Sequence, residues 1–187
     1  MSSLRSMRSS NVDLQRGITL VELLVSTVVV AVLVGLAVPS LKSMLLNNRI
    51  SAQMDRLFAS MNYARNTALN NNVSVKVCPV SVAGSATCGA NWSSGWIVVN
   101  VGNNALLESH PVAPNDPILS VVPIGGVSLS SVVFDQRGLT TTQGNFKTCD
   151  SRGSAYARSL TVLPTGFVQS GGIAGQAVWN ASSIACP

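Results

Sequence analysis

The feature that most constrains the fold of this chain is a continuous apolar run from Ile18 to Val38, near the amino terminus. The run contains a single charged residue, Glu22, which lies close to its start. An apolar segment of about 20 residues is long enough to cross a bilayer as a helix. The sequence therefore predicts a transmembrane helix followed by one modest domain, because 187 residues leave room for little more.

A cleaved secretory signal peptide is the alternative interpretation of this run. Arg5, Arg8 and Arg16 precede it, as basic residues precede the apolar region of a signal peptide. The apolar region of a signal peptide, however, is about 7 to 15 residues long, whereas this run continues to Pro39. We therefore expect the basic leader to stay in the cytoplasm and the bulk of the chain to be exported.

The helix is expected to resume beyond Pro39, with a kink there, and to end at the three consecutive asparagines that begin at Asn70. Cationic residues spaced by sevens would form one stripe on this second half, either as a solvated face or in contact with lipid headgroups or neighbouring subunits. These cations are Lys42, Arg49 and Arg56. Apolar residues recur at helical spacing and should cover a sheet: they are Met54, Leu57, Phe58, Met61, Ala64 and Ala68.

From Val73 onward the pattern changes to short β-rich segments separated by Gly, Pro and Asn. The order of elements predicts an α+β fold, with one long helix packed on a C-terminal antiparallel β-sheet. Residues 78–94 and 100–117 are rich in turn-forming residues and are expected to be loops. The expected strands lie within Val73–Val77, Trp96–Val99, Ile118–Val122, Val127–Phe134 and Ser159–Leu163.

All four cysteines lie downstream of the apolar run, in the part that we expect to be exported, where disulfides persist. Four cysteines allow three connectivities. Of these we favour Cys78 with Cys88, as a local loop, and Cys149 with Cys186, which would hold the tail. A zinc site is the alternative, but neither pair has the spacing of a zinc motif and the single histidine, His110, is distant in sequence.

The composition does not indicate catalysis or general nucleic-acid binding. The net charge of +5 falls to +3 without residues 1–17, since 9 basic residues then stand against 6 acidic ones. His110 has no plausible nucleophile partner in the sequence, and the cysteines are expected to form disulfides. We expect neither an enzyme nor a cofactor.

At the leader boundary the sequence reads Arg16-Gly17-Ile18-Thr19-Leu20-Val21-Glu22. It resembles the class III signal of type IV pilins and type II secretion pseudopilins. The resemblance implies that a prepilin peptidase cuts between Gly17 and Ile18 and methylates the new amino terminus. Ile18 stands where phenylalanine is commoner in the family. This departure concerns the efficiency of methylation and not the cleavage.

The same resemblance gives Glu22 and Pro39 their expected roles in assembly. After cleavage they become the fifth and twenty-second residues, where the family carries its glutamate and its helix-breaking proline. A carboxylate inside a membrane helix costs a few kcal/mol and needs a partner. The resemblance implies that the partner is the amino terminus of a neighbouring subunit; a glutamate that snorkels to the interface is the alternative.

Further segments resemble the GspH/FimT family, and especially FimU-type minor pilins. The Asp-x-x-Gly and Pro-x-Gly matches among them could equally be hairpin turns on their own; the family supplies only the order of the segments. The segments are Arg65 with the preceding Tyr63-Ala64, Phe134-Asp135-Gln136-Arg137-Gly138, Cys149-Asp150-Ser151-Arg152-Gly153 and Leu160–Gly166.

The function implied is that of a minor pilin in a type IV pilus, which helps to prime assembly at the tip complex. Its partners would be prepilin peptidase, other minor pilins, the major pilin and the inner membrane, with the C-terminal domain in the periplasm. A type II secretion pseudopilin is one alternative. The expected divisions are a leader at 1–17, a membrane and filament-core helix at 18–39, an amphipathic half at 40–72 and a β-rich domain at 73–187.

A DNA-binding minor pilin for natural transformation, like some FimT-like proteins, is the other alternative. The chain after Pro164 contains no lysine or arginine. The nearest basic residues could form a patch if the sheet gathers them, and isolated surface charges are the simpler interpretation. They are Arg137, Lys147, Arg152 and Arg158.

Overall fold

The computed structural model describes residues 17–113 and 117–186. The chain divides into two compact units between Lys42 and Ser43, which we call the apolar unit (residues 1–42) and the globular unit (residues 43–187). The predicted leader falls on residues 1–17, of which only Gly17 is among the described residues.

Helix α1 runs from Leu20 to Asn71 and is continuous through Pro39. It ends at the predicted asparagines, where Asn72 adopts a positive φ of 53°, a conformation that asparagine tolerates and that terminates helices. Within the described residues, α1 is the one helix whose length and composition suit a membrane span. Its large apolar side chains from Leu20 to Leu45 are exposed.

The helix presents one face to the core of the globular unit. The buried positions repeat every three or four residues, as one face of an α-helix requires; they are Ile50, Gln53, Met54, Leu57, Ser60, Met61, Ala64 and Ala68. Phe58 does not belong to this face and is 37% exposed, because each residue is turned by about 100° from the one before it.

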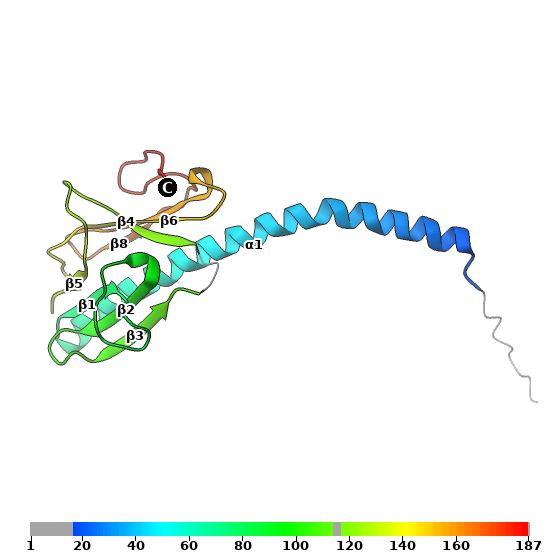
Figure 1. The fold of residues 1–187 in the computed structure, drawn as a ribbon. Helices are drawn as coiled ribbons and strands as arrows, with labels where there is room; N and C mark the ends of the chain where they lie inside the picture. The colour runs from blue at the N-terminus through cyan, green and yellow to red at the C-terminus, as the bar shows by residue number, and fades with distance from the viewer. Residues whose placement is uncertain (1–16, 114–116, 187) are drawn as a thin grey trace, which may run out of the picture. The chain divides into compact units, whose positions relative to one another are not determined.

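Two four-stranded antiparallel sheets complete the globular unit (Figure 1). The first has the order β3-β2-β1-β5 and the second the order β4-β6-β7-β8. The α+β prediction of a long helix on antiparallel β-structure is therefore confirmed. The strands are β1 (Val75–Pro79), β2 (Gly95–Asn100), β3 (Leu106–Pro111), β4 (Ile118–Val122), β5 (Val132–Phe134), β6 (Gly144–Cys149), β7 (Arg158–Val162) and β8 (Val168–Ser170).

Three of these strands were not predicted. β3 lies within residues 100–117, which were wrongly expected to be loop, and its Glu108-Ser109-His110 segment is polar because it forms an edge of the first sheet. β6 is central in the second sheet, yet it carries Lys147 and Thr148, so its sequence does not alternate clearly. β8 has only three residues. Such strands form through pairing with their neighbours more than through their own composition.

One apolar core joins the helix to both sheets. It contains Leu57 and Met61 of α1 together with strand residues from the first sheet, such as Val77, and from the second, such as Phe146. The two disulfides, Cys78–Cys88 and Cys149–Cys186, are those that we favoured from the sequence. Each lies in a smaller apolar cluster of its own.

The C-terminal tail covers the face of the second sheet that points away from α1. Ser159 of β7 donates a hydrogen bond to the carbonyl oxygen of Gln176 at 3.0 Å and accepts one from the amide of Val178 at 2.9 Å. On the same face Thr161 donates to Asn145 at 2.7 Å. These polar side chains are buried and hydrogen-bonded, which satisfies groups that would otherwise destabilise the fold.

Candidate functional site

The first turn of α1 is organised by Thr19. Its side-chain oxygen accepts a hydrogen bond from the amide of Glu22 at 3.2 Å, and its carbonyl oxygen accepts one from Leu23 at 3.1 Å. Thr19 is thus the N-cap of the helix, which satisfies amides that have no partner inside it. Gly17 and Ile18 precede the helix and are exposed, so the predicted cleavage position lies in non-helical backbone next to a capped helix.

The fold itself does not require a glycine at position 17. A Cβ built on Gly17 meets nothing within 4 Å, and its φ lies outside the left-handed region that favours glycine. Glycines that a fold needs usually combine a positive φ with close contacts. Neither backbone conformation nor close packing among the described residues therefore requires a glycine at position 17.

Glu22 is the one charge in the first turn of α1 and is exposed. No ion pair joins it to any residue that the structure describes. The positive end of the helix dipole favours a carboxylate at this position. Inside a bilayer, a carboxylate at this position would be a buried charge and would need a cation close by.

Pro39 lies inside the helix, with Gly35 four residues before it. Proline has no amide hydrogen, so the carbonyl oxygen of Gly35 lacks its usual donor. A Cβ on Gly35 would also meet nothing within 4 Å. One backbone hydrogen bond is therefore missing in this part of the helix, and helices bend readily at such positions.

In the globular unit, Arg152 ties the turn between β6 and β7 to the helix. Its guanidinium donates to both oxygens of Asp150, at 2.6 to 3.2 Å, and to the side-chain oxygen of Asn47 in α1 at 2.7 Å. It also stacks over the Tyr156 ring, 4.0 Å from the ring centre. The Arg152 and Asp150 side chains are only 15% and 6% exposed. We call this group of four residues the Arg152 clasp.

The Arg152 clasp has an electrostatic consequence for Asp150. Burial raises the pKa of this carboxyl group, but the hydrogen bonds and positive charge of Arg152 outweigh burial and lower its pKa below the ordinary value. As the pH falls, the unfolded chain therefore takes up this proton first. The stability that the ionised carboxylate contributes is complete above its unfolded pKa of about 3.9 and is lost as the pH falls through the lower folded pKa.

We expect Asp150→Asn to lower stability at neutral pH and to flatten the loss of stability between about pH 5 and pH 2. The measurement is urea unfolding of the purified chain in detergent across this pH range. Asp135→Asn is the matched control, because Asp135 also has a lowered pKa, caused first by the amide of Leu139, but lies at the surface beside Arg137. If the stability of Asp150→Asn fell as steeply with decreasing pH as that of the parent chain, protonation of Asp150 would not contribute to the acid dependence of stability.

Arg65 forms a second connection, near the other end of the helix. Its guanidinium donates to the carbonyl oxygens of Gly138, at 3.1 Å, and Thr165, at 3.4 Å. Gly138 belongs to the turn after β5, and Thr165 to the turn between β7 and β8. The two turns also bond directly, because the amide of Thr140 donates to the carbonyl oxygen of Pro164 at 3.0 Å. Three of the segments that carried the family resemblance therefore meet at Arg65.

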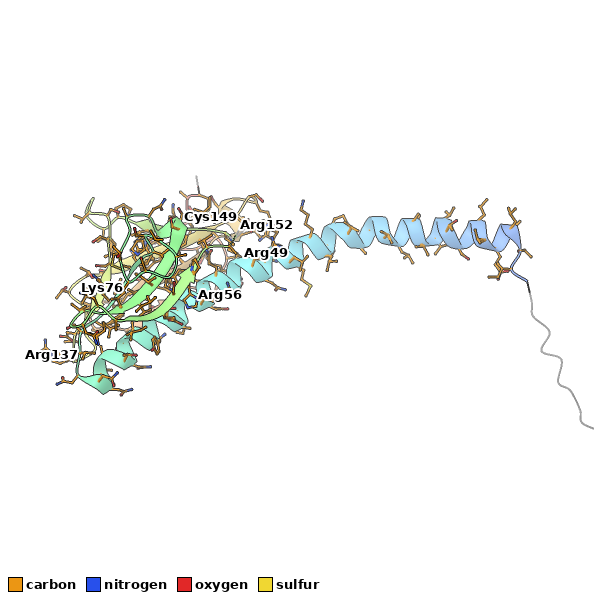
Figure 2. All side chains as sticks on the ribbon, turned by 60° about the horizontal axis from the view of Figure 1, so that its bottom comes forward. Arg49, Arg56, Lys76, Arg137, Cys149 and Arg152 are labelled. Carbon is orange, nitrogen blue, oxygen red and sulfur yellow. A yellow bond between two sulfur atoms is a disulfide. The ribbon has the colours of Figure 1, made fainter. Side chains whose placement is uncertain are left out.

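The four basic residues considered for DNA binding are not brought together. Arg137 and Arg152 lie at opposite ends of the globular unit (Figure 2). Arg158 pairs with Thr148, and Lys147 with Ser159, so Arg158 and Lys147 point to opposite faces of the second sheet. Lys147 donates to the carbonyl oxygen of Ala185, and Arg158 to that of Gly172 at 2.9 Å. Lys147 and Arg158 therefore each bond to a backbone carbonyl oxygen within the fold, and DNA binding by the four residues stays a prediction.

The Arg152 clasp was missed from the sequence, where Arg152 was treated as a candidate surface cation. The spacing of Asp150 and Arg152 within one turn is the signal that could have suggested an ion pair. Its helix partner Asn47 is separated from Arg152 by 105 residues, and no local pattern identifies such a partner.

A long helix with an exposed apolar start and antiparallel sheets on its second half defines a pilin-like protein. The sequence agrees, since residues 13–38 match the model of the prokaryotic N-terminal methylation motif. Residues 53–166, more than half of the chain, match the model described as type II transport protein GspH. This chain therefore belongs to the GspH family.

Two solved structures share this fold. Both are crystal forms of the type IV minor pilin FimU of Pseudomonas aeruginosa. The first has a TM-score of 0.55 at 18% sequence identity, and the match covers 70% of this chain and 95% of FimU. The second has a TM-score of 0.53 at 17% identity and covers 68% and 98%. No curated protein matches the chain.

Proposed function

We propose that this chain is a minor pilin that is made as an inner-membrane precursor, cleaved between Gly17 and Ile18 by prepilin peptidase and built into a type IV pilus. The observation that carries the proposal is the start of α1. A glycine that meets no close contact precedes a capped helix, whose one carboxylate in the first turn, Glu22, has no ion-pair partner among the described residues. The methylation motif over residues 13–38 supports the same processing step.

Cleavage would create a partner for the carboxylate of Glu22. Hydrolysis of the bond between Gly17 and Ile18 releases a new amino terminus, which carries a positive charge at neutral pH. This amine sits about one helical turn before Glu22, so in a neighbouring parallel helix it can reach the carboxylate of an adjacent subunit. A charge pair in the apolar surroundings of packed helices is strong, and it selects one axial offset between them.

The exposed apolar side chains of α1 determine where such a protein can reside. The stretch from Leu20 to Leu45 would be covered first by lipid and then by the helices of neighbouring pilins. The basic leader would keep the amino terminus in the cytoplasm and place the globular unit in the periplasm. We assign residues 1–17 to the leader, 18–39 to the membrane and filament core, 40–72 to the amphipathic half and 73–187 to the β-rich domain.

Within the pilus, the proposed role is to prime filament assembly with other minor pilins at the tip complex. A glutamate at position 22 suits a subunit with neighbours along the filament axis. A type II secretion pseudopilin is the second candidate, favoured by the description of the family model that residues 53–166 match. Deletion of the gene separates the two, because loss of surface pili supports the first role and loss of exoprotein secretion the second.

We expect Gly17→Ala to leave an uncleaved membrane protein and Glu22→Ala to be cleaved but reduced at least about tenfold in sheared filaments. The reason is that the first change blocks formation of the amine and the second removes its partner. Immunoblots of membrane and filament fractions measure both effects. Glu22→Gln is the matched control, since it keeps the side-chain shape without the charge and should behave like Glu22→Ala. Normal filament content in either Glu22 variant would contradict the assembly mechanism.

A further inference from the structure

Helix α1 passes from exposed to buried surroundings over a short stretch, residues 43–49, which we call the entry segment. The first buried position of the helix is Ile50, which is 1% exposed. Before it, Ser43 and Leu46 are half-buried, and the other residues of the entry segment are exposed. The apolar contacts of the globular unit therefore give the entry segment little support.

Arg152 supplies the hydrogen bonds that join the entry segment to the β-structure. Its Nη1 donates to the side-chain oxygen of Asn47 at 2.7 Å and to the carbonyl oxygen of Ser43, one turn earlier, at 3.4 Å. Among the described residues, no other hydrogen bond connects residues 43–49 to the sheets. Because Asp150 and Tyr156 already hold the guanidinium in place, these bonds cost little further side-chain entropy.

The weak point of the helix lies just before the entry segment. Pro39 removes one helical hydrogen bond there, and helices bend readily at such a position. A helix that opens at one point loses further bonds residue by residue, and a short helical segment without outside contacts is only marginally stable in water. Without such contacts, opening at Pro39 would continue through the entry segment to Ile50.

We propose that the Arg152 clasp stops this opening, so that α1 bends between Gly35 and Lys42 and stays helical from Ser43 onward. Opening as far as Asn47 would break the bonds from the helix to the guanidinium. The Arg152 and Asp150 side chains are largely buried, so water replaces those bonds poorly. The clasp lies entirely within the globular unit, and the inference does not depend on the proposed role in a filament.

A second turn of the same sequence pattern shows what is particular to Arg152. Asp135-Gln136-Arg137-Gly138 repeats the Asp-x-Arg-Gly pattern of residues 150–153, and in both turns the arginine donates to the aspartate two residues before it. The Arg137 side chain, however, is 79% exposed, and among the described residues its guanidinium bonds to Asp135 alone. The contact with the helix therefore distinguishes Arg152 from Arg137.

Hydrogen exchange of the full-length chain in lipid nanodiscs, measured by mass spectrometry, tests the proposal. After correction for intrinsic rates, we expect the amides of residues 44–49 to exchange at least about tenfold more slowly than those of residues 40–42. Asn47→Leu removes the acceptor and leaves the turn unchanged, and Arg152→Lys keeps the charge without the planar fork. Both variants should remove most of this difference.

Two controls separate the clasp from general stability. The amides of residues 54–64, where the helix packs on the core, should keep their protection in both clasp variants. Arg137→Lys makes the same substitution in the turn that lacks the helix contact, and it should leave exchange unchanged along the whole helix.

Pairs of spin labels measure where the helix bends. Labels on Leu45→Cys and Ala59→Cys, both at exposed positions beyond Pro39, should give a narrow distribution around the helical distance of about 21 Å. Labels on Ala31→Cys and Leu45→Cys have the same spacing but span Pro39, and we expect a broader distribution. Adding Asn47→Leu or Arg152→Lys should broaden the distribution of the first pair.

Unchanged exchange at residues 44–49 in both clasp variants, or an equal effect of Arg137→Lys, would overturn the proposal. A distribution between positions 45 and 59 of the parent chain as broad as that between positions 31 and 45 would overturn it too, because the helix would then open past the clasp. Loss of protection at residues 54–64 in the clasp variants would show that Arg152 supports the whole fold and does not act as a local stop.

Discussion

Gly166→Ala is expected to lower the free energy of unfolding of the globular unit by at least about 4 kcal/mol, the upper end of single-residue effects. A Cβ at this position would lie 1.7 Å from the carbonyl oxygen of Gly138 and 3.0 Å from Nε of Arg65. Gly166 also has a φ of 74°, which alanine adopts only with strain. The turn between β7 and β8 would have to move away from the turn after β5, and Arg65 would lose its acceptors.

Thermal unfolding of the purified chain in detergent measures this effect, which corresponds to a fall in melting temperature of roughly 10 °C. Gly84→Ala is the matched control, because Gly84 has a φ of 79° but a Cβ there meets nothing within 4 Å. The control isolates the cost of the backbone conformation, about 1 to 2 kcal/mol. An equal fall in melting temperature in the two variants would show that the close approach of Gly166 to Gly138 adds nothing to the destabilisation.

Removal of the Cys149–Cys186 disulfide, by changing both cysteines to serine, is the second large effect. The bond joins residues separated by 37 positions, and loop closure on this scale stabilises a fold by about 4 kcal/mol. It also holds the tail that satisfies the buried hydroxyl group of Ser159. We therefore expect both lower stability and faster amide exchange at Val178, measured by hydrogen exchange and mass spectrometry.

The Cys78–Cys88 pair supplies the control for this disulfide. Its sequence separation is 10, so its removal should cost about 3 kcal/mol and leave the exchange rate at Val178 nearly unchanged. An unchanged melting temperature without the Cys149–Cys186 bond, or equal exchange at Val178 in both variants, would show that the tail is held by its hydrogen bonds alone.

The parts of this protein that follow from the sequence are those that depend on neighbouring residues. The apolar run, the single Glu22, the asparagines that end α1 and the strand at Ile118–Val122 are all local patterns of composition and period. The assembly roles of Gly17, Ile18, Glu22 and Pro39 stay predictions. Their positions just before and within the apolar part of one helix could be predicted from the sequence, because a helix is built from contacts between residues three or four positions apart.

Tertiary structure decided what distant segments do to one another. Leu106–Pro111 is a strand because β2 pairs with it. Its polar residues do not predict a strand from the sequence alone. Arg152 and Arg49 are both arginines in a polar context, yet Arg152 is held by Asp150 and Asn47 whereas Arg49 is exposed. The difference is that the fold brings the side chains of Asp150 and Asn47 to the guanidinium of Arg152. Local sequence therefore determines which elements form, whereas only their packing determines which charged side chains are paired within the fold and which stay exposed.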